Sequence, residues 1–186
     1  YGNAVKNGAQ IAIDEIAEAG GDVQFEMNFQ DDENDAEKSV NAYNNLKDWG
    51  MQILMGTVTS TPCVAVTAES NADNIFTLTP SGSSTDCIGG QPDSDGNIST
   101  PRKDNVFQMC FSDPNQGAAS AQYISEQGLG TKIAIIYNNS DTYSTGIYKS
   151  FLAEAAELGL EIVSETSFTE DNQTDFTVQL NDAKNA

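Results

Sequence analysis

The sequence of 186 residues contains no histidine. This absence excludes Ser-His-Asp and Cys-His nucleophile pairs, HExxH zinc sites and histidine proton shuttles. Neither a GxGxxG nor a GxxxxGK[ST] pattern occurs, so the usual backbone cradles for dinucleotides and nucleoside triphosphates are missing as well. We therefore expect a protein that is not an enzyme and that uses no cofactor.

Basic residues are scarce, with 8 Lys and Arg against 28 Asp and Glu, which gives a formal net charge of −20. Such a surface repels polyanions at long range, so nucleic acid is excluded as the main partner. The sequence has no apolar run of membrane-spanning length and no basic-then-apolar leader. We expect a protein that does not itself span a membrane and whose signal segment, if it is exported, has been removed.

Cysteines are few, and no CxxC pair exists to hold a zinc ion. Cys87 and Cys110 flank a loop rich in Pro, Gly, Ser and Asp, which favours a disulfide between them. Closing that loop would stabilise the fold by about 3 kcal/mol in the chain-entropy model and would indicate an oxidising compartment. The alternative is that Cys63, Cys87 and Cys110 are reduced thiols of a cytosolic protein.

Acidic clusters give no metal site. Asp93, Asp95, Asn97 and Asp104 partly imitate a calcium loop, but the glycine is at the wrong position and no terminal Glu follows. The run Asp31-Asp32-Glu33 follows an expected strand, as in phospho-acceptor domains, although a solvated face explains it better. We expect no bound metal.

Helix and strand patterns alternate along the chain. Residues 23–29 alternate apolar and polar side chains, the period of a half-buried strand, whereas residues 3–19 have helical spacing. Asn34, three residues before Glu37, predicts a capping box that opens a helix ending near Gly50. The other expected strands are 52–55, 75–79, 106–111, 132–137 and 160–168. The other expected helices are 62–71, 116–127, 144–158 and one that starts after residue 175.

This alternation predicts an α/β fold with parallel sheets covered by helices on both faces. Residues 80–105 form a long polar loop, and a second cycle of helix and strand begins after residues 113–115. We therefore expect two lobes, residues 1–114 and residues 115–186. The second lobe has only two strands and is expected to be incomplete.

Small hydroxyl residues follow three of the expected strands, where ligands bind in open parallel sheets. The segments are 56–61, 79–84 and 138–143, and the last of these contains Tyr143. Ser60 and Thr61 beside a helix N-terminus suit a carboxylate. Taken singly, a plain N-cap, a flexible polar turn and a packed surface aromatic are simpler interpretations of the three segments.

Taken in order, the motifs resemble the amino-acid-binding proteins of bacterial ABC importers, of the leucine/isoleucine/valine type. They read GTVTST at 56–61, TPSGSS at 79–84, FQMCFSDPNQG at 107–117 and DTYSTG at 141–146. The opening YGNAVKNGAQIAIDEIAEAGG and the stretch FQDDENDAEKSVNAYNNL are also similar to that family. The resemblance implies the periplasmic-binding-protein type I fold, with doubly wound parallel sheets in two lobes and a first strand that should precede Tyr1.

The resemblance also implies a set of ligand-binding residues. Ser60 with its neighbours Thr59 and Thr61 would hold the α-carboxylate of the ligand. The segment Ser81, Gly82 and Ser83 would meet the carboxylate and ammonium. Tyr143 would close over the ligand from the second lobe, and Tyr1 would wall the side-chain pocket.

The function implied is an extracellular solute-binding protein that captures a small amino acid between two lobes and delivers it to an ABC permease. Such a protein is extracellular or periplasmic after removal of its signal peptide, with attachment as a lipoprotein as one option. A sensor or receptor ectodomain of the same fold is the alternative, and its chain would continue into a membrane span. An enzyme is a third class, which the lack of histidine makes the weakest.

Overall fold

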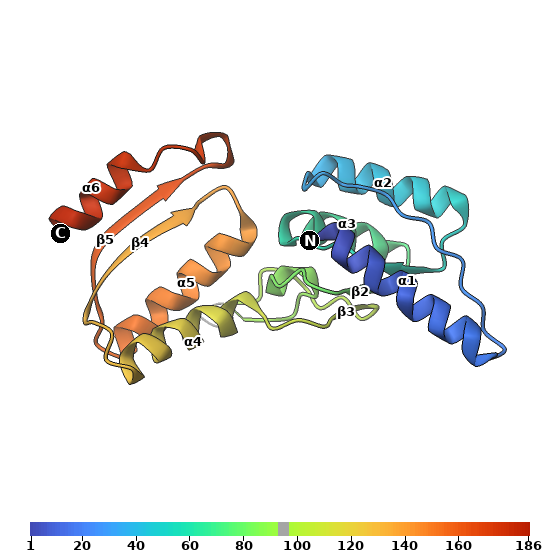
Figure 1. Ribbon diagram of the computed structural model, residues 1–186, viewed down its shortest axis with the longest axis horizontal. Coiled ribbons are helices and arrows are strands. Elements are labelled where there is room, and N and C mark those ends of the chain that lie inside the picture. Colours follow the sequence, from blue (N-terminus) through green and yellow to red (C-terminus); the bar gives the residue numbers. More distant parts are fainter. Residues whose placement is uncertain (93–96) are drawn as a thin grey trace. The chain divides into compact units, whose positions relative to one another are not determined.

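A computed structural model describes residues 1–92 and 97–186 (Figure 1). The chain forms two compact units, one of residues 1–82 with 104–109 and the other of residues 83–103 with 110–186. The lobe boundary expected after residue 114 stays a prediction. Asp93 and Asp95 of the rejected calcium loop lie outside the described residues.

The first unit contains a parallel sheet of three strands in the order β1-β2-β3. The strands are β1 (Ile53–Met55), β2 (Phe76–Thr79) and β3 (Val106–Gln108). Ile53 lies opposite Phe76, and Thr77 lies opposite Val106. Parallel neighbours need a crossover, which helix α3 (Ser60–Ala72) supplies between β1 and β2. The carboxyl ends of β1 and β2 therefore share one edge of the sheet, and the segments after them start there.

Helix α2 (Ala36–Trp49) packs against α3 and buries Tyr43 with Leu54 and Val66. Each of these apolar side chains contributes roughly 1.5–3 kcal/mol when fully buried. The Tyr43 hydroxyl donates a 2.7 Å hydrogen bond to Asp73, which closes α3. This hydrogen bond ties the middle of α2 to the C-terminal end of α3, at the opposite end of α3 from the hydroxyl segments.

Helix α2 begins one residue later than its sequence pattern predicts. Asp35 is the N-cap and accepts a 2.8 Å hydrogen bond from the N–H of Lys38. Asn34 was expected to cap this helix, but its φ of 60° places it in a left-handed turn before the cap. Its backbone N–H donates to Asp32 instead, over 2.9 Å. The N-cap assignment to Asn34 is therefore wrong by one position, and Lys38, three residues after Asp35, does not complete a capping box.

Residues 23–29 do not form the expected strand. The segment follows α1 (Gly2–Ala19), which ends at Gly20 in the left-handed region with φ 73°. It pairs with no strand among the described residues, and Phe25 and Phe29 are 45% and 40% exposed. The alternating pattern is present, but a strand also needs a neighbouring backbone to bond with. The expectation from alternation alone was wrong.

The second unit pairs β4 (Lys132–Asn138) with β5 (Glu161–Phe168) in parallel, and α5 (Thr142–Glu157) crosses between them. Helix α4 (Asp113–Glu126) runs beside α5 (Figure 1). Ala121 of α4 packs with Phe151, Ala155 and Leu160 in the core. The remaining elements are α6 (Thr177–Asn185) and the short 3-10 turns η1 (Thr85–Cys87) and η2 (Glu170–Asn172). Within the described ranges, no helix has the length and apolar character needed to cross a membrane.

Cys63 and Cys87 are fully buried, and Cys110 is partly exposed. The disulfide expected between Cys87 and Cys110 stays a prediction. Cys87 closes the turn η1 inside the second unit, where its side chain is already packed away from solvent.

Candidate functional site

The hydroxyl segments after β1 and β2 lie against each other in the first unit. The Thr79 hydroxyl donates to the carbonyl oxygen of Thr57 over 2.8 Å. The Ser81 hydroxyl donates to the carbonyl oxygen of Val58 over 2.6 Å. Two side-chain hydrogen bonds therefore join segments that are more than twenty residues apart in sequence. The first unit therefore brings these two segments together at one edge of the sheet.

Ser60 is the first residue of α3, and its side chain is only 2% exposed. Thr59 is the N-cap, but its side chain makes no capping hydrogen bond. Its carbonyl accepts the N–H of Cys63 over 3.0 Å, which starts the helix. The positive end of the α3 dipole therefore lies beside Thr59, Ser60 and Thr61, a favourable electrostatic environment for an anion.

Gly82 is a position where only a hydrogen fits. Its N–H donates to the Thr79 hydroxyl over 2.8 Å, which fixes the turn after β2. A Cβ at this position would lie 2.7 Å from Thr79 Oγ1 and 2.9 Å from Cys63 Sγ. The backbone of Gly82 is thus packed directly against α3, and any side chain here would push the two hydroxyl segments apart.

In the second unit, Ser83 lies beside a buried carboxyl group. Ser83 is 3% exposed, and its carbonyl oxygen accepts the backbone N–H of Asp113 over 3.0 Å. Asp113 is 1% exposed, and neither of its side-chain oxygens has a hydrogen-bond partner among the described residues.

Burial disfavours the charged form of this carboxyl and raises the pKa of Asp113 to about 6. The negative charge of Asp141 raises the pKa further, whereas the nearby Ser83 side chain lowers it in part. Asp113 is therefore a buried carboxyl group that gains or loses a proton near neutral pH.

Tyr143 lies in the first turn of α5, and its side chain is 38% exposed. Its hydroxyl pairs with the Gln116 side chain of α4 through contacts of 3.0 and 3.1 Å. Asp141 caps α5 by accepting the N–H of Ser144 over 2.9 Å. The phenol is therefore held at the N-terminal ends of α4 and α5, rather than packed into a core.

Other predicted residues are not gathered in this way. Tyr1 is 99% exposed, and α1 buries none of its residues, so the structure does not place Tyr1 in the wall of a pocket. Ser83 and Tyr143 belong to the second unit, and Ser60, Ser81 and Gly82 to the first. Among the described residues, no cluster of acidic and cysteine side chains could hold a metal ion.

Sequence reasoning gave no role to Asp113 or Gln116. Both stand in the quoted motif FQMCFSDPNQG, so the signal was visible as part of a pattern. Their partners, Ser83 and Tyr143, are about 30 residues away along the chain, which a motif cannot reveal. The structure adds them because it brings the two helix N-termini together.

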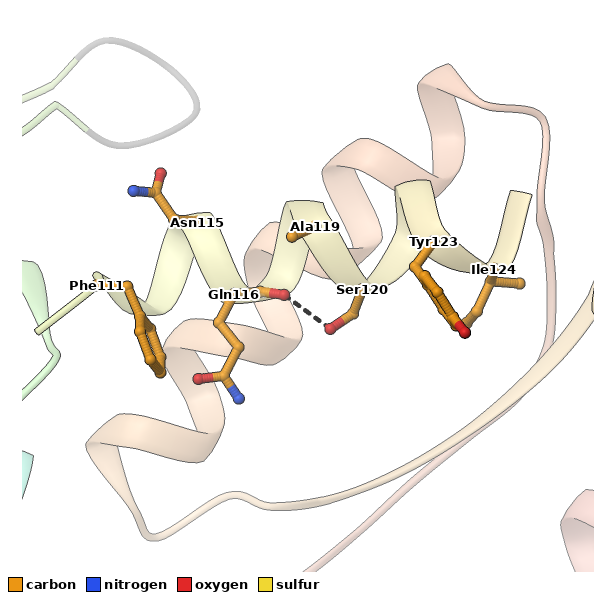
Figure 2. A pocket seen from close by; sticks show the side chains of 7 residues that line it. All are labelled: Phe111, Asn115, Gln116, Ala119, Ser120, Tyr123 and Ile124. Carbon is orange, nitrogen blue, oxygen red and sulfur yellow. Dashed lines mark hydrogen bonds between the residues drawn. The ribbon is translucent and has the colours of Figure 1, made fainter. Parts of the chain in front are cut away.

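An open hollow of about 610 Å³ lies along α4, and none of the predicted ligand residues lines it (Figure 2). Two of its lining residues are joined by the hydrogen bond of 2.7 Å from the Ser120 hydroxyl to the carbonyl oxygen of Gln116. The lining residues are Phe111, Asn115, Gln116, Ala119, Ser120, Tyr123 and Ile124. The lining is mainly apolar and contains no charged side chain, so this hollow does not have the chemistry expected for a zwitterion.

Comparison with known proteins shows that the whole chain is similar to one family. The family model described as periplasmic binding protein matches residues 1–186. The Leu/Ile/Val-binding protein BraC3 of Rhizobium johnstonii is 27% identical over 168 residues, which cover 89% of this chain and 42% of that protein. The Leu/Ile/Val-binding protein homolog 3 of Brucella melitensis is 26% identical, and the match covers 100% of this chain and 48% of that protein.

Solved structures agree with these relatives. The branched-chain amino acid transporter substrate binding protein LivJ of Streptococcus pneumoniae, in complex with isoleucine, superposes with a TM-score of 0.84 at 27% identity. That match covers 99% of this chain and 49% of LivJ. The leucine binding protein LivK of Thermotoga maritima superposes with a TM-score of 0.83 at 22% identity, covering 97% of this chain and 48% of LivK. The chain thus spans less than half the length of these proteins.

Proposed function

Because this chain belongs to the periplasmic binding protein family, we propose that it carries ligand-binding segments for a small amino acid of the leucine, isoleucine or valine type. The observation that carries the proposal is the joining of the two hydroxyl segments through Ser81 and Thr79 beside the N-terminus of α3. The Leu/Ile/Val-binding relatives and the isoleucine-bound neighbour support the choice of ligand class.

In the first unit, the ligand carboxylate is proposed to contact Ser60, with Thr59, Thr61 and Ser81 around it. A neutral site of this kind suits a zwitterion, because hydroxyls and the helix dipole stabilise the carboxylate without a buried counter-charge. The Ser81 hydroxyl can still accept a hydrogen bond while its own proton is donated to the carbonyl oxygen of Val58. Gly82 lets the backbone approach the ligand closely, and Tyr1 is proposed as a further contact.

In the second unit, Ser83 and Tyr143 are the proposed ligand contacts. The Tyr143 hydroxyl is already oriented by Gln116, and its ring is partly exposed, so it remains accessible. An aromatic ring with a polar end can cover an aliphatic side chain and still meet a polar group. These features fit a ligand that has both an apolar and a charged part.

The proposed role is capture without catalysis, followed by delivery to an ABC permease. We place the protein outside the cytoplasmic membrane, in an extracellular or periplasmic location, with a removed signal peptide and a lipid anchor as the proposed form of attachment. The family match supports this location, and the net charge of −20 is compatible with a soluble exported protein.

Calorimetric titration with L-leucine, L-isoleucine and L-valine tests the proposal. 4-Methylpentanoate and 3-methylbutylamine serve as probes that each lack one charge of the zwitterion. We expect saturable binding of at least one amino acid and at least about tenfold weaker binding of both single-charge probes, because each loses a charged contact. Absence of heat for all three amino acids, with the chain folded by circular dichroism, would contradict the proposal.

A serine series locates the binding surface. Ser60→Ala should weaken the affinity by about 1–3 kcal/mol if its hydroxyl meets the carboxylate. Ser125→Ala is the matched control, because Ser125 is an exposed serine near the end of α4. Equal affinity of Ser60→Ala and the control would remove Ser60 from the site.

A further inference from the structure

Helix capping does not explain why the side chain of Asp113 is buried. It is the first residue of the 14-residue helix α4, but the N-cap is Ser112, whose side chain accepts the N–H of Asn115. The carboxyl group of Asp113 is therefore not used to satisfy the end of its own helix. At 1% exposure and without hydrogen-bond partners among the described residues, it occupies a costly position.

The side chain of Asp113 is packed against α5 at a glycine. An added Cβ at Gly146 would lie 2.7 Å from Asp113 Oδ2 and 2.8 Å from Asp113 Cβ. Asp113 thus fills the space that a side chain at position 146 would need. On its other side, its backbone N–H is bonded to the carbonyl oxygen of Ser83. A single residue contacts both the start of the segment at Ser83 and the first turns of α5.

A second side-chain contact joins the same ends of α4 and α5. Gln116 lies three residues after Asp113, and Tyr143 lies three residues before Gly146, so each pair shares a helix face. The Gln116 side chain bonds the Tyr143 hydroxyl, as described above. The helices also approach closely at Gly117, where an added Cβ would lie 2.4 Å from the carbonyl oxygen of Ile147. The N-terminal ends of α4 and α5 are therefore locked by glycine contacts and by side-chain pairs.

We propose that Asp113 is a positioning residue that holds Ser83 and Tyr143 in a fixed arrangement, by packing its side chain onto Gly146 while its backbone bonds Ser83. The inference rests on the proposed function, because Ser83 and Tyr143 are the ligand contacts assigned to the second unit. Asp113 itself need not touch the ligand, since it acts through the segments on either side of it.

The charges around Asp113 make its protonation part of this role. Gly146 and Ser83, which pack against it, do not titrate, and Asp141 at the start of α5 is the acidic group that repels its charge. The neutral carboxyl therefore packs without repulsion, whereas the ionised one is pushed from Asp141. Holding Ser83 and Tyr143 should accordingly be more effective at pH 5 than at pH 7.

Hydrogen exchange measured by mass spectrometry tests the positioning role without a ligand. In Asp113→Ala we expect at least about tenfold faster exchange in peptides that cover residues 83–86 and 142–147, because both segments lose a packing partner. Peptides from α2 and α3 should change less than about twofold. Asp48→Ala, an exposed aspartate of α2, is the control and should leave all of these peptides unchanged. Unaltered exchange in both segments, or a uniform rise across the chain, would overturn the inference.

Binding of L-isoleucine gives a second readout that a merely structural role would not change. Asp113→Ala should bind about tenfold more weakly than wild type. Asp113→Asn keeps the shape of a neutral carboxyl, so it should bind within about threefold of wild type at pH 5. The wild-type affinity should fall about threefold between pH 5 and pH 7, and this change should vanish in Asp113→Asn. A pH dependence that persists in Asp113→Asn would also overturn the inference.

The two proposals fail in different ways. If wild-type protein binds none of the three amino acids, the proposed function fails, and the exchange experiment still decides whether Asp113 positions Ser83 and the first turn of α5. If wild type binds but Asp113→Ala binds equally well, the proposed function stands and the positioning role is wrong.

Discussion

The hydroxyl of Ser81 donates a 2.6 Å hydrogen bond to the carbonyl oxygen of Val58. This bond joins the segment after β2 to the segment after β1, at the N-terminal end of α3. Ser81 itself is exposed, so its hydroxyl oxygen remains open to a ligand while its proton is held by Val58. One side chain thus serves both to align two segments and to present an acceptor.

Replacing Ser81 by alanine should therefore affect binding more than stability. The lost bond lies at the surface, where a hydrogen bond contributes about 0.5–1.5 kcal/mol to folding. Amino-acid affinity should fall more, by about tenfold or greater, because both the alignment and a polar contact are lost. Titration calorimetry and urea unfolding of the same variant measure the two effects. A loss of stability with unchanged affinity would assign Ser81 to the fold alone.

Gly82→Ala should destabilise the first unit. The added methyl group would lie under 3.0 Å from Thr79 Oγ1 and from Cys63, and overpacking of this kind costs about 1–3 kcal/mol. Gly8→Ala is the matched control, because a Cβ at Gly8 in α1 meets nothing within 4 Å. Urea unfolding should give a lower midpoint for Gly82→Ala, while Gly8→Ala should be neutral or slightly stabilising. Equal midpoints would mean that the turn after β2 can shift freely.

The sheets and helices of the fold could be predicted from the sequence, but not all of the contacts between residues. Periodicity found both parallel sheets and their crossover helices, and the predicted type I fold is confirmed by the family match and the superpositions. Residues 23–29 show where periodicity fails, because alternation describes side chains and says nothing about whether another strand is available. The Asn34 error arose because two neighbouring residues, Asn34 and Asp35, both suit an N-cap.

The candidate site could also be predicted only in part. Strand ends and helix starts follow from local pattern, so the meeting of Ser81 with the segment after β1 could be expected. The contact of Asp113 with Gly146 could not, because nothing in the sequence shows which glycine faces which carboxylate.

Asp113 should make the stability of the second unit depend on pH. Its folded pKa of about 6 exceeds the ordinary value of 3.8, so between these values the folded state binds more protons than the unfolded state. Its stabilising contribution is therefore complete below about pH 4 and is lost as the pH rises through about 6.

Comparison with Asp113→Asn isolates this effect from the other carboxylates. Relative to Asp113→Asn, wild type should lose about 1–2 kcal/mol of unfolding free energy between pH 4 and pH 7. This value allows for partial solvation of the carboxyl. Urea unfolding at several pH values measures it. A difference that does not vary with pH would show that Asp113 titrates normally.

The pair formed by Gln116 and Tyr143 should be energetically coupled. Tyr143→Phe removes the hydroxyl and leaves the Gln116 amide without this partner, whereas Gln116→Met removes the amide and keeps the length of the side chain. Because Tyr143 is 38% exposed, water replaces part of the lost bond, and each change should cost only about 0.5–1 kcal/mol of stability. The double variant should cost less than the sum of the two, by an interaction energy of about 0.5 kcal/mol. If the pair orients Tyr143 for the ligand, both single variants should also weaken L-isoleucine binding to a similar extent. Strict additivity in unfolding and in binding would mean that the two side chains act independently at the ends of α4 and α5.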